Sequence, residues 1–262
     1  MFIIGELING MYKQVGRAIV DKDKKTIQRI ARQQLEQGAN ALDVNVGPVT
    51  NEPVEAMKWL TETIQEVADA PLCFDSTKAA VIEAGLKLAK KKAIINSTTA
   101  DDEKLNVLLP LAKKYNAGII GLAMDKTGVP RDRYKRSEHA LKIISSCMEQ
   151  GLDLADVYID PIVLPVNVAQ AQGAEVLESI REFKIISDPP PKTVIGLSNV
   201  SQGAKERALI NRTFLIMAAA FGLSAAILDP LDKNLMDAVI TAELLLNKSI
   251  YCDSYLEAYR KK

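Results

Sequence analysis

Eight short apolar segments, each followed by a polar loop and a helical pattern, constrain the fold more than any other feature of this sequence. The segments lie at residues 2–5, 41–46, 72–74, 93–95, 118–124, 157–159, 193–197 and 224–228. Unbroken apolarity over such short runs is typical of parallel strands that are buried on both faces. Helical periodicity occurs between and after them, at residues 25–37, 54–67, 79–88, 103–115, 137–150, 175–186, 209–221 and 234–246. Eight strand–helix units predict an α/β fold of the closed (β/α)₈ TIM-barrel type, whereas an open doubly wound sheet does not require eight.

The chain is expected to form a single domain over residues 1–262. This length suits one barrel, and the sequence contains no linker, internal repeat or low-complexity stretch. Hydrophobic residues make up 48% of the chain and charged residues 25%, which is the balance of an ordinary globular protein. Lys and Arg together number 33, as do Asp and Glu, so no net charge attracts a polyanion. This balance argues against a general nucleic-acid binder.

Three further features indicate a cytoplasmic protein. Cys73, Cys147 and Cys252 show no metal-ligand spacing and are expected to be reduced thiols. The N-terminal segment lacks the pattern of a signal peptide. No apolar run approaches the ~18 residues that a membrane-spanning helix needs, so we expect no membrane partner.

Three of the loops that follow predicted strands are long, at residues 125–136, 161–174 and 198–208. In a barrel these loops share the face on which active sites are built. The first contains a basic run of Arg131, Arg133, Lys135 and Arg136. A solvated surface loop is favoured over a docking patch for this run.

Polar side chains lie at or just after the ends of most predicted strands. They are Glu6, Asn9, Asp43, Asn45, Asp75, Asn96, Asp160, Ser198 and Asn199, with Gln202 and Arg207 nearby. One such residue can serve as a helix cap or turn former, but in a barrel the whole set converges on one mouth and predicts a polar binding site. A pterin ring suits this set of side chains, because one carboxylate can accept hydrogen bonds from both the exocyclic amine of the pterin and the neighbouring ring N–H. Asn amides match the remaining ring atoms.

Other chemistries fit the sequence less well. The single histidine, His139, lies in a predicted helix and is expected to be a surface or packing residue, which argues against a catalytic triad or a His-rich metal site. Neither GxGxxG nor GxxxxGK[ST] occurs, so the simplest dinucleotide and P-loop sites are excluded. We expect a site without metal, although Asp43, Asp75 and Asp160 leave a Mg²⁺ site open as an alternative.

Several motifs resemble the methyltetrahydrofolate:corrinoid/iron–sulfur protein methyltransferases of acetyl-CoA-forming anaerobes. The motifs are IIGELING at 3–10, DVNVGP at 43–48, CFDST at 73–77, INSTTA at 95–100, YIDPIVLPVNVAQ at 158–170 and GLSNVSQGAKERALINRTFL at 196–215. The resemblance extends to YCDSY at 251–255 and so covers essentially the whole chain. It implies a pterin-binding barrel related to dihydropteroate synthase and to the folate module of cobalamin-dependent methionine synthase. It also implies a homodimer.

The resemblance further implies roles for individual residues. Asp75, Asn96 and Asp160 would bind the hydrogen-bonding edge of the pterin. Asn199 would be the catalytic residue near N5 of the pterin. Other substrate-binding residues would be Gly196 and Ser198, which line the pocket, and Gln202 and Arg207 further along the same loop.

The reaction implied is transfer of the N5 methyl group of methyltetrahydrofolate to cob(I)alamin on a corrinoid iron–sulfur protein, in the reductive acetyl-CoA pathway. No cofactor would be bound permanently, since cobalamin would stay on the partner and no cobalamin-ligand motif surrounds His139. We expect Asn199 to donate a hydrogen bond that strengthens in the transition state, while water or solvent delivers the proton.

Three alternatives stay open at this point. A dihydropteroate synthase should carry a basic Ser-Arg-Lys-like segment after its seventh strand, where this chain has Ser198-Asn199-Val200-Ser201. A methyltransferase of the same family could serve another corrinoid partner. A folate-binding protein without catalytic activity would bind methyltetrahydrofolate and leave cob(I)alamin unmethylated.

Overall fold

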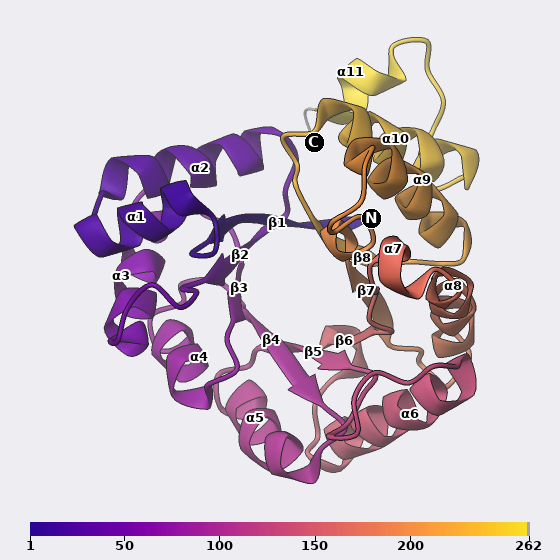
Figure 1. Cartoon of the computed structure of the whole chain (residues 1–262), viewed down its shortest axis with the longest axis horizontal. Helices are drawn as coiled ribbons and strands as arrows, with labels where there is room; N and C mark the ends of the chain where they lie inside the picture. Colours follow the sequence, from indigo (N-terminus) through magenta and orange to yellow (C-terminus); the bar gives the residue numbers. More distant parts are fainter. Residues whose placement is uncertain (261–262) are drawn as a thin grey trace.

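The computed structural model describes residues 1–260 and shows a closed barrel of eight parallel strands inside a ring of helices (Figure 1). The strands are β1 (Phe2–Asn9), β2 (Ala41–Asn45), β3 (Leu72–Asp75), β4 (Ile94–Thr99), β5 (Gly118–Leu122), β6 (Val157–Asp160), β7 (Lys192–Gly196) and β8 (Ala225–Leu228). They pair in sequence order, and β1 closes the barrel by pairing with β8 from Phe2↔Ala225 to Gly5↔Leu228. The predicted (β/α)₈ barrel is therefore confirmed.

The helices between the strands follow the predicted pattern with several additions. Their bounds are α1 (Lys13–Asp21), α2 (Lys24–Glu36), α3 (Pro53–Gln65), α4 (Ala79–Leu86), α5 (Asp102–Lys114), α6 (Arg133–Glu149), α7 (Val166–Ala169), α8 (Gln172–Phe183), α9 (Arg207–Ala220), α10 (Lys233–Leu245) and α11 (Tyr255–Arg260), with 3₁₀ turns η1 (Leu154–Asp156) and η2 (Leu197–Asn199). Helices α1, α7 and α11 lie outside the predicted set; α7 and α11, with four and six residues, are too short to show a helical period clearly in the sequence. No helix among residues 1–260 is long and apolar enough to cross a membrane.

Two strands continue four residues past the ends that the sequence predicted. β1 runs on to Asn9 after a shift in its register with β2 between Gly5 and Ile8. β4 runs on to Thr99 after a similar shift against β5 between Asn96 and Thr98. Glu6 and Asn96 therefore lie within strands rather than after them. Register shifts of this kind commonly occur beside binding sites, because they change the direction of a side chain.

The inside of the barrel is filled by one buried side chain from each strand. These are Ile4, Ala41, Cys73, Ile94, Ile120, Tyr158, Val194 and Ala225. A larger cluster of buried residues fills the space between the strands and the surrounding helices. The barrel is thus closed below its mouth by packed side chains, and the inner layer forms a floor for whatever lies at the carboxyl ends of the strands.

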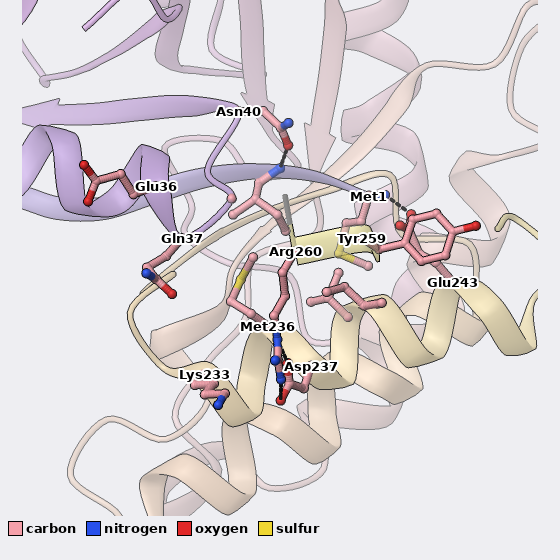
Figure 2. A pocket seen from close by; sticks show the side chains of 14 residues that line it. Met1, Glu36, Gln37, Asn40, Lys233, Met236, Asp237, Glu243, Tyr259 and Arg260 are labelled. Atoms are coloured by element: carbon pink, nitrogen blue, oxygen red, sulfur yellow. Dashed lines mark hydrogen bonds and ion pairs between the residues drawn. The ribbon is translucent and has the colours of Figure 1, made fainter. Parts of the chain in front are cut away.

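The opposite end of the barrel holds a separate cavity of about 400 Å³ (Figure 2). The amino group of Met1 pairs there with Glu243, and the Arg260 guanidinium of α11 pairs with Asp237 of α10 at 2.6 Å. These contacts attach both ends of the described chain to α10. They lie at the amino ends of β1 and β2, away from the loops that follow the strands.

Candidate functional site

The site is the second inward-facing layer of the barrel, directly above the apolar floor. Side chains in a strand alternate between the two faces, so the residue two places after each floor residue also points inward. This layer consists of Glu6, Asp43, Asp75, Asn96, Leu122, Asp160, Gly196 and Ile227. Four carboxyl groups and a carboxamide therefore face one another at the carboxyl ends of the strands.

Asp43 and Asp75 occupy neighbouring strands, and each accepts a hydrogen bond from an amide side chain of another strand. Asn96 Nδ2 donates to Asp43 Oδ1 at 3.0 Å, and Asn45 Nδ2 donates to Asp75 Oδ2 at 2.6 Å. Burial raises the pKa of both acids, and the negative charge of Asp75 raises the pKa of Asp43 further. The pair therefore retains a proton more strongly than free aspartates do. A ligand that brings N–H donors would favour ionisation of these acids.

Asp160 is buried at the end of β6, with 7% of its surface exposed. Burial raises the pKa of Asp160 to about 7, against the opposing effects of backbone hydrogen bonds from Ile162 and Gly196 and of the positive charge of Arg136. The hydrogen bond from Ile162 N to Asp160 Oδ1 measures 2.7 Å. Asp160 can thus change its protonation state near neutral pH, which makes it a candidate for binding or proton transfer.

Asn199 lies at the end of η2, on the loop that follows β7. Its exposed side chain folds back over Gly196, and a Cβ atom at position 196 would lie 3.0 Å from Asn199 Nδ2. Gly196 also donates its backbone N–H to Asp160. The absence of a side chain at Gly196 therefore leaves room for Asn199 beside the inward-facing layer, close to Asp160.

The loop that carries Asn199 is held from two sides. Ser198 Oγ donates to Glu6 Oε1 of β1 at 2.7 Å, across the end of β8. Arg207 Nε donates to Ser201 Oγ at 3.2 Å, and its Nη2 lies 3.5 Å from the Ser198 carbonyl oxygen. Burial raises the pKa of Glu6, while the Ser198 hydrogen bond opposes this rise. These contacts fix Ser198 and Asn199 relative to the barrel.

The structure brings most of the predicted site residues together. Asp75, Asn96, Asp160 and Gly196 belong to the inward-facing layer, and Ser198 and Asn199 lie on the adjoining loop. Gln202 and Arg207 are exposed on the same loop and at the start of α9; the contacts of Arg207 are with that loop. A cavity of about 490 Å³ opens beside this group and is lined by Asn45 and Asp75.

The sequence places Glu6, Asp43 and Asn45 at strand ends but assigns none of them to the pterin. The spacing of two residues from the apolar floor is the signal that identifies Glu6 and Asp43 as members of the same layer. Within residues 1–260, no three His, Cys, Asp or Glu side chains form a group that could hold a metal ion. The Mg²⁺ alternative therefore gains no support from the arrangement of the acids.

The basic run at residues 131–136 is only in part the solvated loop that the sequence predicted. Helix α6 begins at Arg133, so part of the run is helical. Arg136 points inward and is completely buried. His139, one turn later on the same face, is also buried and is a packing residue rather than a surface one. Arg131 and Lys135 are exposed, as expected for a charged surface segment.

Comparisons with known proteins identify the family of this chain. Residues 13–229 match the model of a family described as "Pterin binding enzyme". The chain is 31% identical to the methylcorrinoid:tetrahydrofolate methyltransferase of Eubacterium limosum over 267 aligned positions, covering 100% of this chain and 97% of that protein. It is 30% identical to the methionine synthase of Mycobacterium tuberculosis, covering 87% of this chain but only 20% of that much longer protein.

Solved structures with the same architecture include two of Yersinia pestis dihydropteroate synthase. One, bound to a pterine–sulfa conjugate, has a TM-score of 0.69 and 17% identity and covers 94% of each chain. The other, a sulfonamide complex, has a TM-score of 0.72 and 16% identity, covering 95% of this chain and 94% of that one. At these identities the likeness establishes the shared fold.

Proposed function

Because this chain belongs to the pterin-binding enzyme family, we propose that it transfers the N5 methyl group of methyltetrahydrofolate to cob(I)alamin. The observation that carries the proposal is the inward-facing layer, in which Asp75, Asn96 and Asp160 lie beside the loop of Asn199. This layer supplies hydrogen-bond acceptors for the edge of a pterin, and the adjoining loop supplies a hydrogen-bond donor. The similarity to the Eubacterium limosum methyltransferase supports methyl transfer over other pterin chemistry.

The pterin would lie above the apolar floor with its hydrogen-bonding edge toward the acids. A carboxylate can accept from the exocyclic amine and a ring N–H together, and the amide of Asn96 can pair with the ring carbonyl or a ring nitrogen. Ser198 and Gly196 would border the ring. Gln202 and Arg207 would lie further along the loop toward the remainder of the folate.

In the reaction, cob(I)alamin attacks the methyl carbon from the open side of the mouth. A cobalt–carbon bond forms with the electron pair of Co(I), the N5–carbon bond breaks, and its electron pair stays on N5, which gains a proton to give tetrahydrofolate. Asn199 Nδ2 donates a hydrogen bond to N5 as charge develops there. Water provides the proton, and the pKa of Asp160, about 7, would also permit this residue to exchange a proton near neutral pH.

The acceptor that we propose is cobalamin carried by a corrinoid iron–sulfur protein of the reductive acetyl-CoA pathway, as the sequence motifs imply. The long loops after β5, β6 and β7 would contact that partner. The Eubacterium limosum relative is named for transfer from a methylcorrinoid to tetrahydrofolate, which supports the reverse direction, with another corrinoid partner, as a second candidate.

An anaerobic spectrophotometric assay tests both directions. The protein is mixed with methyltetrahydrofolate and cob(I)alamin, either free or on a corrinoid protein, and methylcobalamin formation is followed; the reverse assay starts from methylcobalamin and tetrahydrofolate. Transfer in either direction supports a methyltransferase, and a higher rate with the corrinoid iron–sulfur protein than with other corrinoid proteins supports the proposed partner. Folate binding without transfer to any corrinoid would contradict the proposal and indicate a folate carrier.

Replacing Asn199 with alanine should lower kcat by roughly 10²–10³-fold, as the loss of a preorganised hydrogen-bond donor typically does. Folate affinity should change much less, because the pterin-edge acceptors stay in place. Single-turnover rates and equilibrium folate titrations separate the two effects. A rate within a few-fold of wild type would remove Asn199 from the catalytic role.

We further propose that the chain forms a homodimer, as the resemblance implies. Sedimentation velocity should then report about twice the chain mass of 28.6 kDa. A monomer at micromolar concentration would contradict this assembly without affecting the proposed chemistry.

A further inference from the structure

Arg136 is a charged residue in the interior of the protein, and it has no part in the methyl-transfer mechanism proposed above. It lies in the first turns of α6 and is among the largest side chains that are completely buried. Its Nε donates to the Pro161 carbonyl oxygen at 2.7 Å, and its Nη2 donates to Gln172 Oε1 at 2.7 Å. Arg136 thus connects α6 to the segment that directly follows Asp160 and to the start of α8.

The segment Asp160-Pro161-Ile162 has an unfavourable backbone conformation. Ile162 has a φ angle of 68°, and a β-branched residue rarely adopts this left-handed region. Such a conformation persists only where neighbouring contacts enforce it. Two contacts do so here, because the Ile162 N–H bonds to the Asp160 carboxylate and the Pro161 carbonyl accepts from Arg136.

The Arg136 guanidinium is incompletely paired for a buried cation. Within residues 1–260 its Nη1 atom has no hydrogen-bond partner. The negative groups around it are Glu175 of α8, Asp132 at the start of α6 and Asp160 of β6. Burial of a charge without a hydrogen-bonded carboxylate costs free energy. If the role of this residue were only structural, a neutral hydrogen-bond donor would fulfil it at a smaller cost in free energy.

From these contacts we infer that Arg136 is a positioning residue, which holds the turn at Pro161 so that the Asp160 carboxylate faces the ligand. This inference rests on the proposed function, since it assigns Asp160 to the pterin. The guanidinium charge also lowers the pKa of Asp160, against the rise that burial causes. Arg136 therefore supports both the geometry and the ionised form of the acid.

The surroundings of Asp160 make this electrostatic effect measurable. β5 presents the apolar Leu122 opposite Asp160, β7 contributes the Gly196 backbone N–H, and α6 contributes Arg136. His139 is buried further along α6. The acids Glu6, Asp43 and Asp75 face Asp160 across the inward-facing layer. Arg136 is the charged group that shifts the pKa of Asp160, while Glu175 and Asp132 act on Arg136.

The test measures methyltetrahydrofolate affinity between about pH 5 and pH 9, the range in which an acid with a pKa near 7 titrates. In the wild type, affinity should fall as the pH decreases through about 7, because protonated Asp160 loses acceptor capacity. Arg136→Met should bind roughly 10-fold more weakly, and the midpoint of its pH dependence should move upward. Arg136→Lys keeps the charge but loses the fixed geometry, so its affinity should fall while its midpoint stays near that of the wild type.

Lys135→Met is the matched control, because Lys135 is an exposed neighbour whose ammonium group pairs with Glu138. It should bind and titrate like the wild type. An unchanged midpoint in Arg136→Met would overturn the inference, even if that variant were less stable. If Arg136→Met does not fold, wild-type affinity in Arg136→Lys would overturn it. Failure of the wild type itself to bind methyltetrahydrofolate would instead contradict the proposed function.

Discussion

At the scale of single residues, burial controls the chemistry of the mouth. Burial raises the pKa values of Glu6, Asp43, Asp75 and Asp160, and no lysine or arginine forms a direct ion pair with any of them among the described residues. Without a ligand these carboxyl groups tend to keep protons, and a donor-rich neutral ring would favour their ionisation. The buried acids that would bind a pterin thus lower the stability of the unliganded protein.

Asp160→Asn should stabilise the unliganded protein at alkaline pH. The folded-state pKa of Asp160, about 7, lies above its ordinary value of 3.8, so the folded state binds this proton more tightly than the unfolded state does. Protonated Asp160 therefore stabilises the folded state fully below about pH 4, and this stabilisation is lost as the pH rises through about 7. At one pKa unit per about 1.4 kcal/mol, the ionised group costs at most about 4 kcal/mol.

Urea unfolding of wild type and Asp160→Asn at a series of pH values measures this effect. The variant should be more stable at pH 8 and should lose part of the pH dependence between about pH 4 and pH 7. The asparagine Oδ1 can still accept from the Ile162 N–H, so the turn keeps one of its contacts. Equal pH dependence in the two proteins would contradict a raised pKa at Asp160.

At the scale of elements, the strands and their helices position the site through close packing as well as hydrogen bonds. α4 packs on β3 through Gly85, whose missing side chain leaves room for the ring of Phe74. Phe74 directly precedes Asp75, so this contact supports the strand end that carries the acid. The register shifts in β1 and β4 lie in the same region, between Gly5 and Ile8 and between Asn96 and Thr98.

Gly85→Ala should destabilise the protein by about 1–3 kcal/mol through overpacking. The added Cβ would lie 2.5 Å from the Phe74 ring, and the ring is completely buried. Gly173→Ala in α8 is the matched control, because its Cβ would make an ordinary contact at 3.8 Å with Phe214. The control should gain up to about 1 kcal/mol from helix propensity. Thermal unfolding of both variants gives the comparison, and a stabilised Gly85→Ala would refute the packing argument.

At the scale of the whole molecule, closure of the barrel brings distant parts of the chain together. β1 and β8 pair although more than two hundred positions separate them, and Ser198 reaches Glu6 across that closure. At the other end, α11 and the amino terminus both pack on α10 (Figure 2). The site can form only when both halves of the chain are in place.

Arg260→Ala should weaken the attachment of α11 and lower the free energy of unfolding by about 1 kcal/mol. Arg260 makes two hydrogen bonds to Asp237, at 2.8 and 2.6 Å, with a third of its side chain exposed. Lys58→Ala is the control, since Lys58 and Glu55 form a more exposed pair within α3 and should contribute almost nothing. Methyl transfer should be unaffected in both variants, because neither residue lies near the mouth. Equal unfolding midpoints for Arg260→Ala and wild type would contradict the attachment.

The sequence by itself determined the eight strand–helix units, and with them the barrel, because strand and helix periods are local properties of the chain. It also predicted that Asp75, Asn96, Asp160 and Asn199 meet at one mouth, since residues at the ends of parallel strands converge whatever the details of packing. The tertiary structure decided the rest. Arg136 looked like part of a charged surface run, and only the packing of α6 against the turn after β6 buries it. Glu6 acquires its contact with Ser198 only through barrel closure, and the raised pKa values exist only because the folded barrel removes these acids from water.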